Sequence, residues 1–260
     1  MPGIGEITPE SDLAAEIRRA LDRSGLVLQA GDVLVVAQKI ISKNEGRLRS
    51  LATVVPSSQA LELASRVRKD PRFVELVLQE SSAVVRAVPD ILITRHRQGF
   101  VMANAGIDRS NLAPLQSGSV PGSEDDQVLL LPIDCDASAM RLRAAMAPDQ
   151  PAVIISDSFG RPWRQGVVNV ALGVAGIVAL RDQRGDTDRH GRVMQTTQVA
   201  VADAIAAAAG LLMGESSEGQ PVVLMRGLPA ELTARPVDAQ ADSAMSVQSL
   251  IRPAEQDLFA

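Results

Sequence analysis

The sequence predicts an α+β fold, and three observations support this class. Apolar runs of strand length, such as Val33–Ala37 and residues 153–155, alternate with segments whose apolar residues recur at helical spacing. Three short β-rich runs follow one another between residues 83 and 103 with little chain between them, as strands of an antiparallel sheet do. A mixture of hairpins and strand–helix alternation favours α+β over a regular doubly wound sheet.

The composition limits the kind of protein. With 260 residues, 46% of them hydrophobic, the chain is long enough for one large domain or two smaller ones. The net charge of -5 argues against a general nucleic-acid or anionic-membrane surface, which would need a basic face. No signal peptide is visible, and the apolar stretch at 199–213 is interrupted by Asp203. We therefore expect a cytoplasmic protein without membrane or nucleic-acid partners.

Cysteine and histidine are scarce. Cys135 is the only cysteine, which excludes a disulfide framework and a thiolate metal cluster. It has no neighbouring histidine to activate it as a nucleophile, so we expect a buried thiol. His96 and His190 are too few and too scattered for a zinc site, and His190 is expected in a surface turn.

The N-terminal part of the chain contains a predicted helix and a predicted strand. Ser11 is a candidate N-cap for a helix that ends before Gly25. The strand Val33–Ala37 follows, and directly after it residues 38–47 are predicted to form a polar loop rich in anion-binding groups.

The middle of the chain is predicted to form short helices and strands. Ser57 or Ser58 can cap a helix, and a second helix follows it. A loop of Ser, Gly, Pro and acidic residues at 114–126 is either a surface loop or a lid. The expected elements are helices through 61–67 and 73–78 and strands at 83–88, 91–94, 100–103 and 128–131.

The C-terminal part again alternates strands and helices. Asp136 is a plausible N-cap for a helix over 139–146. A β-branched, glycine-punctuated run at 167–180 favours strands, and an alanine-rich segment at 197–213 favours a closely packed helix. We expect next an acidic, glycine-rich loop at 214–219, the strand Val222–Met225 and a short helix around 246–251.

Residues 154–166, with the sequence IISDSFGRPWRQG, combine an apolar run with acidic, hydroxyl and basic side chains. The apolar run stops at Asp157, and Ser158 follows. We expect a loop at the end of the strand, which is where α/β proteins often keep reactive groups. A charged turn without function is the alternative. Phe159 and Trp163 can either stack on a flat ligand or pack against the fold.

Three predicted loops each place a carboxylate close to glycine after an apolar element. These carboxylates belong to Asp108, Asp157 and Glu215, and the hydroxyl of Ser158 is adjacent to Asp157. Oxygen ligands without histidine or cysteine suit hard cations such as Mg²⁺ or Mn²⁺. Each carboxylate taken alone can equally be an ordinary loop or cap residue, so the metal hypothesis requires that the three converge in space.

Basic residues near these loops can neutralise phosphate oxygens. Familiar nucleotide motifs are absent, because the sequence contains neither a P-loop nor a dinucleotide-binding glycine motif after a strand. The G-x-S-x-G nucleophile motif is absent as well. The basic candidates are Lys39, Lys43, Arg47, Arg161 and Arg164.

Five segments together resemble a known family. They are, in order, GDVLVVAQKIISKNEGR, VMANAGIDRSN, VIISDSFGRPWRQGVVNVALGVAG, DRHGR and AAAAGLLMGESSEGQPVVLMRG. On these segments, which cover residues 3–227, the chain resembles the coenzyme F420-0:γ-glutamyl ligase family. The N-A-G-I-D-x-S-N and D-[ST]-x-G-R-x-x-R-x-G patterns carry most of the specificity.

The resemblance implies a two-domain α+β fold that forms an intertwined homodimer. Residues 1–260 would be one ligase domain of two structural subdomains, in the stand-alone form without a fused flavin-binding domain. The implied activity is GTP-dependent addition of L-glutamate to coenzyme F420-0, or to its dehydro form, followed by extension of a γ-linked tail with release of GDP and phosphate. The implied cofactors are a pair of Mg²⁺ or Mn²⁺ ions and K⁺.

The resemblance also assigns site residues, position by position. The metal ligands would be Asp108, Asp157, Ser158 and Glu215, while Arg161 and Arg164 are catalytic candidates facing anionic ligand. Ser158 stands where the family often has threonine, which keeps the hydroxyl, and the family often has serine near Gln38. The GTP contacts would be Gly3, Ile4, Gly5, Glu6, Gln38, Lys39, Lys43, Asn111, Met213, Gly214, Ser216, Ser217, Glu218, Gly219 and Gln220.

Two other function classes remain open on the sequence. A metal-dependent nucleotide phosphohydrolase or phosphotransferase would use the same carboxylates as a ligase. A non-catalytic cofactor-binding module would use the same loops without turnover.

Overall fold

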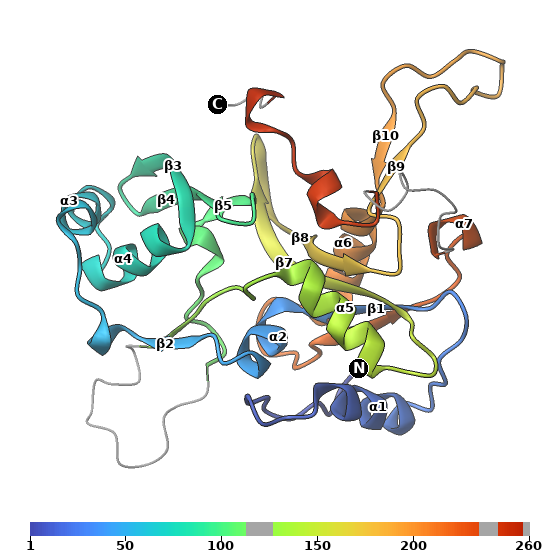
Figure 1. Ribbon diagram of the computed structural model, residues 1–260, viewed down its shortest axis with the longest axis horizontal. Helices are drawn as coiled ribbons and strands as arrows, with labels where there is room; N and C mark the ends of the chain where they lie inside the picture. Colours follow the sequence, from blue (N-terminus) through green and yellow to red (C-terminus); the bar gives the residue numbers. More distant parts are fainter. Residues whose placement is uncertain (113–126, 234–243, 257–260) are drawn as a thin grey trace.

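A mixed four-stranded sheet lies at the centre of the computed structural model, which describes residues 1–112, 127–233 and 244–256 (Figure 1). Its strand order is β11 (Val222–Met225), β1 (Val33–Ala37), β7 (Ala152–Arg161) and β8 (Arg164–Ala175). Only β1 and β7 run parallel, and the other two pairings are antiparallel. The expected α+β class is therefore confirmed.

Helices cover both faces of this sheet. Alternate residues of β1 explain the arrangement: Val33 and Val35 join the apolar core under α6 (Val201–Met213). Leu34 and Val36 join the core under α1 (Leu13–Arg23) and α5 (Cys135–Ala145). A strand buried on both faces needs a continuous apolar sequence, as the run in β1 has.

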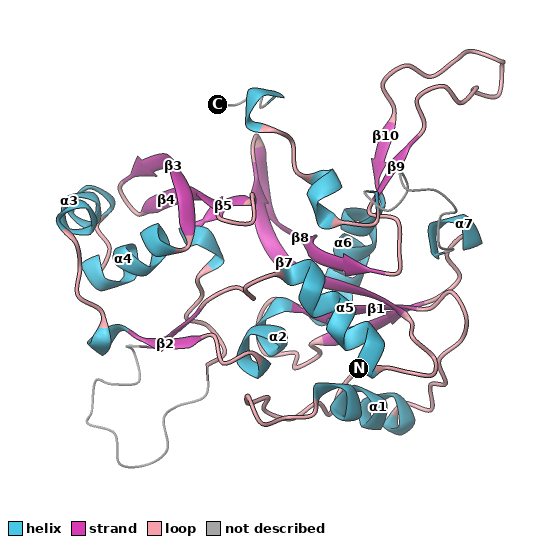
Figure 2. Cartoon of the chain, viewed as in Figure 1, coloured by secondary structure: helices cyan, strands magenta, loops and turns pink. Residues whose placement is uncertain are grey.

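A second group of elements has its own apolar core beside the central sheet. Figure 2 shows α3 (Ser58–Val67) and α4 (Pro71–Gln79) next to a three-stranded antiparallel sheet. Phe73, Val77 and Leu92 are among the buried residues of this core. The strands, in sheet order, are β3 (Ser81–Val88), β4 (Ile91–His96) and β5 (Val101–Ala103).

The remaining elements are short. Two further sheets pair β2 with β6 and β9 with β10. They and the other short elements are α2 (Gln38–Asn44), β2 (Leu48–Ser50), β6 (Gln127–Leu129), β9 (Leu180–Asp182), β10 (Gln198–Ala200), α7 (Ala230–Thr233) and the 3₁₀ turns η1 (Leu51–Thr53), η2 (Asn104–Gly106), η4 (Val247–Leu250) and η5 (Ala254–Gln256).

Two predicted loops are regular structure. The polar loop expected at 38–47 begins as the helix α2. Ile40 and Ile41 of this helix pack into the apolar core, and its polar residues occupy the remaining positions. The loop expected after Asp157 is a β-hairpin: β7 continues to Arg161 and pairs with β8 along its length. A bulge at Ile155/Ser156 shifts the register just before Asp157. The loop predicted at 114–126 lies outside the described residues.

Two predicted helix caps are wrong by one or two residues. The side chain of Asp12, not Ser11, accepts the amide of Ala15 at 3.0 Å, and α1 begins after it. Asp134, not Asp136, caps α5 through the amide of Ala137 at 2.9 Å. Asp12 and Asp134 each precede the amide that they cap by three residues, which is the spacing of an N-cap side chain to the first turn of a helix. Ser57 does cap α3 as predicted.

Other expectations concern single residues. Cys135 is buried, which confirms the expected core thiol, and burial raises the pKa of its thiol strongly. His190 is exposed in a turn, and its amide donates to Asp188. Trp163 is 87% exposed at the tip of the β7–β8 hairpin, so the packing alternative for this residue is wrong. In the described part of the chain, no helix is long and apolar enough to span a membrane.

Candidate active site

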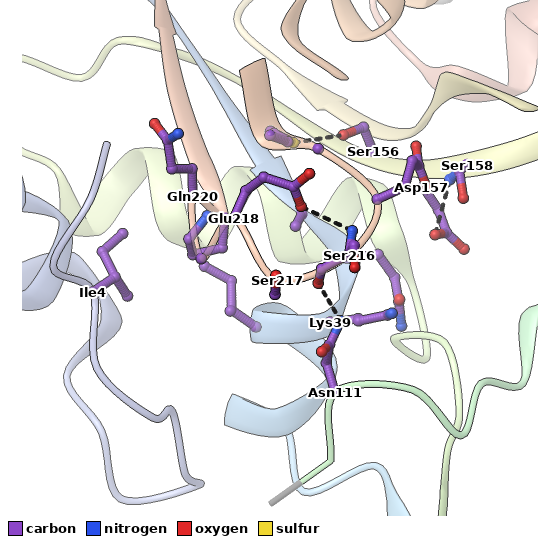
Figure 3. A pocket seen from close by; sticks show the side chains of 18 of the residues that line it. Ile4, Lys39, Asn111, Ser156, Asp157, Ser158, Ser216, Ser217, Glu218 and Gln220 are labelled. Atoms are coloured by element: carbon purple, nitrogen blue, oxygen red, sulfur yellow. Dashed lines mark hydrogen bonds between the residues drawn. The ribbon is translucent and has the colours of Figure 1, made fainter. Parts of the chain in front are cut away.

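One cavity of about 470 Å³ brings together segments that are far apart in the sequence (Figure 3). This volume is in the range of small-molecule sites, roughly 300–1,000 Å³. Its walls come from the N-terminal segment, α2, the loop after η2, the start of the β7–β8 hairpin and the loop after α6. The residues predicted to contact nucleotide or metal that line it are Ile4, Gly5, Glu6, Gln38, Lys39, Lys43, Asp108, Asn111, Asp157, Ser158 and residues 213–220.

Lys43 connects two of these walls. Its Nζ atom lies 2.6 Å from Oε1 of Glu6 and donates to the carbonyl of Asn111 at 2.9 Å. Asn111 in turn donates from Nδ2 to the carbonyl of Ser216 at 3.2 Å. The N-terminal segment, α2, the 108–111 loop and the 213–220 loop are thus joined by a short chain of polar contacts.

Gln38 begins α2 and is almost fully buried. Its Nε2 atom donates to the hydroxyl of Ser42 at 2.6 Å, while Oε1 is buried without a hydrogen-bond partner among the described residues. An unsatisfied buried amide oxygen is costly, which makes Gln38 a residue that a bound donor would stabilise.

Asp108 is held in place by strained backbone and by the sheet. Asn104 and Ala105 both have left-handed backbone angles, with φ of 52° and 53°, and Ala105 is fully buried. Such strain persists only where the surroundings enforce it and is common near functional sites. Asp108 itself exchanges two backbone hydrogen bonds with Leu129, of 3.1 and 2.9 Å.

The carboxylate of Asp157 lies in the cavity without a direct ion-pair partner among the described residues. Its Oδ1 atom accepts the amide of Ser158 at 2.9 Å, and no described residue forms an ion pair with it. Desolvation raises the pKa of the Asp157 carboxyl to about 7, against the lowering effects of the Ser158 amide and of the charge on Lys39. The carboxylates of Asp108 and Glu215 contribute to the rise. Those two contributions show that the three predicted acidic groups are close enough to interact electrostatically.

The loop after α6 is tightly turned. Gly214 has a φ of 73°, and a Cβ atom there would lie 2.1 Å from Cδ of Glu218. Oε2 of Glu218 accepts the amide of Ser216 at 2.9 Å. Glycine at 214 therefore lets the loop fold back on itself, so that residues 215–220 border the cavity.

Four predicted site residues do not line this cavity. Arg47 is buried and pairs with Glu80 at 2.7 Å. The carbonyl of Gly3 instead accepts Nη2 of Arg23 at 2.6 Å. Arg161 and Arg164 close the far end of the hairpin, where Arg161 donates to the carbonyl of Gln165 at 3.2 Å. Because β7 continues past Asp157 at about 3.3 Å per residue, it carries these arginines away from the acidic groups.

Two polar lining residues were missed by sequence reasoning. Ser156 and Asn169 are buried and border the cavity, and Asn169 pairs with Ser158 across the hairpin. Asn169 also contacts α6, since a Cβ atom on Gly210 would lie 2.5 Å from its Oδ1. An asparagine inside the apolar run of residues 167–175 was the signal that would have identified it.

The donor set matches the chemistry of a hard divalent cation. Carboxylate and hydroxyl oxygens are what Mg²⁺ and Mn²⁺ prefer, and Asp157 has no direct ion pair with a described residue. In residues 1–112, 127–233 and 244–256, however, no group of three or more His, Cys, Asp or Glu is close enough to hold a metal ion. Asp108 is instead paired with Lys39 at 2.7 Å. The metal ligand set thus remains a prediction.

The fold and cavity define an α+β protein with a polar, charged site of small-molecule size. A family model described as "F420-0:Gamma-glutamyl ligase" matches residues 3–227. The chain belongs to this family and is a ligase that forms an amide bond. This result favours the ligase hypothesis over the phosphohydrolase and the cofactor-binding module.

Three curated relatives illustrate the similarity, and each is named Coenzyme F420:L-glutamate ligase. The protein from Methanothermobacter thermautotrophicus is 42% identical over 95% of this chain and 92% of its own length. The protein from Methanopyrus kandleri is 41% identical, with coverage of 98% and 93%. The protein from Halobacterium salinarum is 42% identical, with coverage of 86% and 84%.

Proposed function

We propose that this protein catalyses GTP-dependent addition of L-glutamate to coenzyme F420-0 and extends a γ-linked glutamate tail. The names of the relatives support the choice of acceptor and amino acid. The observation that carries the proposal is the cavity itself, in which the unpaired carboxylate of Asp157 faces the same space as the side chains of Lys39 and Lys43.

The chemistry requires that a poor acyl donor be activated. A carboxylate oxygen of the acceptor attacks the γ-phosphorus of GTP, the bond to the β–γ bridging oxygen breaks, and GDP leaves. The resulting acyl phosphate is attacked at its carbonyl carbon by the amine of glutamate. Phosphate then departs with the bonding electrons, and the ammonium proton is released.

The protein's contribution to phosphoryl transfer is positioning and charge neutralisation. Lys39 and Lys43 are assigned to the phosphates, because both ammonium groups border the cavity. The 213–220 loop, with its serines and glycines, is assigned to the nucleotide, because such loops offer backbone amides to anions. The N-terminal residues Ile4, Gly5 and Glu6 close the other side.

Asp108, Asp157, Ser158 and Glu215 are the residues that would hold divalent cations. Mg²⁺ or Mn²⁺ bound there would neutralise charge on the phosphate oxygens during transfer. The carboxylate of Asp157, which has no direct ion pair with a described residue, would gain a cation in contact with it.

The proposed reaction is tested by incubating the purified protein with GTP, Mn²⁺, L-glutamate and coenzyme F420-0 and measuring products by mass spectrometry. We expect the acceptor to gain glutamyl groups, with ATP a poorer substitute for GTP. In parallel, Asp157→Asn and Glu215→Gln should each lose most turnover. Full turnover in both variants would show that the assigned metal ligands are wrong even though the reaction is right.

The resemblance to the family also supports a homodimer in the cytoplasm, with K⁺ as a further ion. Light scattering coupled to size-exclusion chromatography tests the oligomeric state. A mass of one chain at the concentration of the assay would contradict the dimer.

A further inference from the structure

A second polar cavity, of about 420 Å³, adjoins the candidate active site. It lies where α3 ends and α4 begins, and the loop after η2 forms its other wall. Its lining includes Arg68, Lys69, Asp70, Phe73, Asp108 and Arg109. Asp108 also lines the first cavity, so this residue borders both spaces.

The charge of this second cavity is positive. Among the described residues, none of the three cations Arg68, Lys69 and Arg109 forms an ion pair. The two carboxylates in the lining pair with cations that do not line this cavity. Asp70 pairs with Arg72 at 2.7 Å, and Asp108 pairs with Lys39 at 2.7 Å. Unpaired cations around a concave surface are a favourable setting for an anionic ligand.

Two of the cations are positioned by the fold. The guanidinium of Arg109 lies 4.9 Å from the ring centroid of the buried Phe73, an arrangement that restricts its orientation. Arg68 occupies the left-handed C-cap position of α3, with a φ of 53°, where its amide donates to the carbonyl of Ala64. The charged groups therefore come from a rigid helix end and a stacked side chain.

The location of the second cavity next to Asp108 indicates which reactant it binds. Nucleotide and metal are assigned to the first cavity. The second cavity would therefore hold the other anionic reactant, with its reacting group directed toward Asp108. Charged side chains dominate the second cavity, which leaves little apolar surface for a flat ring system. A ligand with closely spaced carboxylates fits this description better.

We propose that Arg68, Lys69 and Arg109 form the binding site for the carboxylate end of an acidic substrate. This substrate is either free L-glutamate or the acceptor, bound through the acidic end to which glutamate is joined. This inference rests on the proposed ligase function and adds to it a substrate site on the α3–α4 unit.

The test compares steady-state kinetics of the wild type with Lys69→Gln and Arg109→Gln. Arg66→Gln is the matched control, because Arg66 is exposed in the last turn of α3, close to Lys69 in the sequence, but does not line the cavity. We expect each cavity variant to raise KM for L-glutamate by about tenfold or more, as loss of a charge-assisted contact does. KM for GTP and the melting temperature should stay close to those of Arg66→Gln.

The possible outcomes separate the two sources of the bound carboxylate, which are free L-glutamate and the acceptor. A rise in KM for coenzyme F420-0 with KM for glutamate unchanged would support the site and assign it to the acceptor. Unchanged KM for both, or a rise confined to GTP, would overturn the inference while leaving the ligase proposal intact.

Equilibrium dialysis with labelled L-glutamate and with coenzyme F420-0 adds a readout that does not depend on turnover. If the wild type forms no glutamyl product, the ligase proposal fails. The cavity inference then survives only if one of these ligands binds the wild type and binds Arg109→Gln at least about tenfold more weakly.

Discussion

The Nζ atom of Lys39 lies 2.7 Å from Oδ2 of Asp108, the residue that borders both cavities. Ser110 binds both partners: its hydroxyl lies 2.6 Å from Lys39 Nζ and 3.0 Å from Asp108 Oδ2. Burial alone would raise the pKa of Asp108, but hydrogen bonds from Lys39 and Ser110 hold that pKa below its usual value. Asp108 is therefore ionised at neutral pH.

Lys39→Gln should reduce ligase turnover by about a hundredfold, because it removes a cation from the proposed phosphate site. The measurement is initial-rate kinetics at saturating GTP and glutamate. Arg19→Gln is the control, since Arg19 forms an exposed ion pair with Glu16 on α1. If Lys39→Gln were as active as Arg19→Gln, Lys39 would have no role in neutralising phosphate.

Asp157→Asn should stabilise the metal-free protein at pH 8 while removing ligase activity. Desolvation of this carboxylate is the main cost, the repulsion from Asp108 and Glu215 adds to it, and the attraction of Lys39 offsets only part of it. The neutral amide therefore relieves a cost on the order of 2–4 kcal/mol. Urea denaturation in the presence of a chelator measures the change. Asp186→Asn, at an exposed turn, should leave the free energy of unfolding nearly unchanged. A clear loss of stability in Asp157→Asn would contradict this account of the carboxylate.

Asp32 should give the protein an acid-sensitive contribution to stability. This buried carboxylate accepts Nε and Nη2 of Arg226 at 2.8 and 2.7 Å, and these bonds lower its pKa. A lowered folded-state pKa gives stability that is present above the unfolded value, about 3.9 for aspartate, and is lost as the pH falls through the folded value.

Melting curves of wild type and Asp32→Asn across pH test this contribution. The variant should melt several degrees lower at pH 7, and the difference should narrow below about pH 4. The control Asp149→Asn, at an exposed ion pair with Arg18, should show no such pH dependence. A gap between Asp32→Asn and wild type that stays constant down to acid unfolding would contradict the ion-pair explanation.

Gly173→Ala should destabilise the central sheet. A Cβ atom at this position of β8 would lie 2.2 Å from the carbonyl oxygen of Cys135, and backbone at the start of α5 cannot move aside cheaply. We expect a loss of about 1–3 kcal/mol or more in the free energy of unfolding, measured with urea. Gly160→Ala is the matched control, because nothing lies within 4 Å of a Cβ there. Equal effects of the two substitutions would show that close packing at Gly173 is not the cause.

The secondary structure that could be predicted is the part dominated by apolar patterning. The strands β1 and β11 were predicted to the residue, since both are apolar throughout and packed on the sheet. The helix α2 was missed because it has only seven residues, and Gln38, Lys39 and Lys43 use their polar side chains in the cavity. Its sequence therefore resembles a loop.

The candidate site could be predicted by residue type but not by arrangement. Motif resemblance pointed to Asp108, Asp157 and Glu215, and the structure places all three at one cavity. Their proximity depends on sheet register and on the bridge between Asp108 and Leu129, neither of which local spacing encodes. The same register explains why Arg161 and Arg164 lie elsewhere, and why Asn169 opposite Ser158 went unnoticed.

The central claim, that this cavity couples GTP cleavage to amide formation, is tested most directly by stoichiometry. GDP, phosphate and glutamyl product are quantified together in one reaction with GTP, Mn²⁺, L-glutamate and coenzyme F420-0. The account predicts equal amounts of all three, with no GDP formed when the acceptor is omitted. GDP and phosphate released without any glutamyl product would contradict it and identify a nucleotide phosphohydrolase instead.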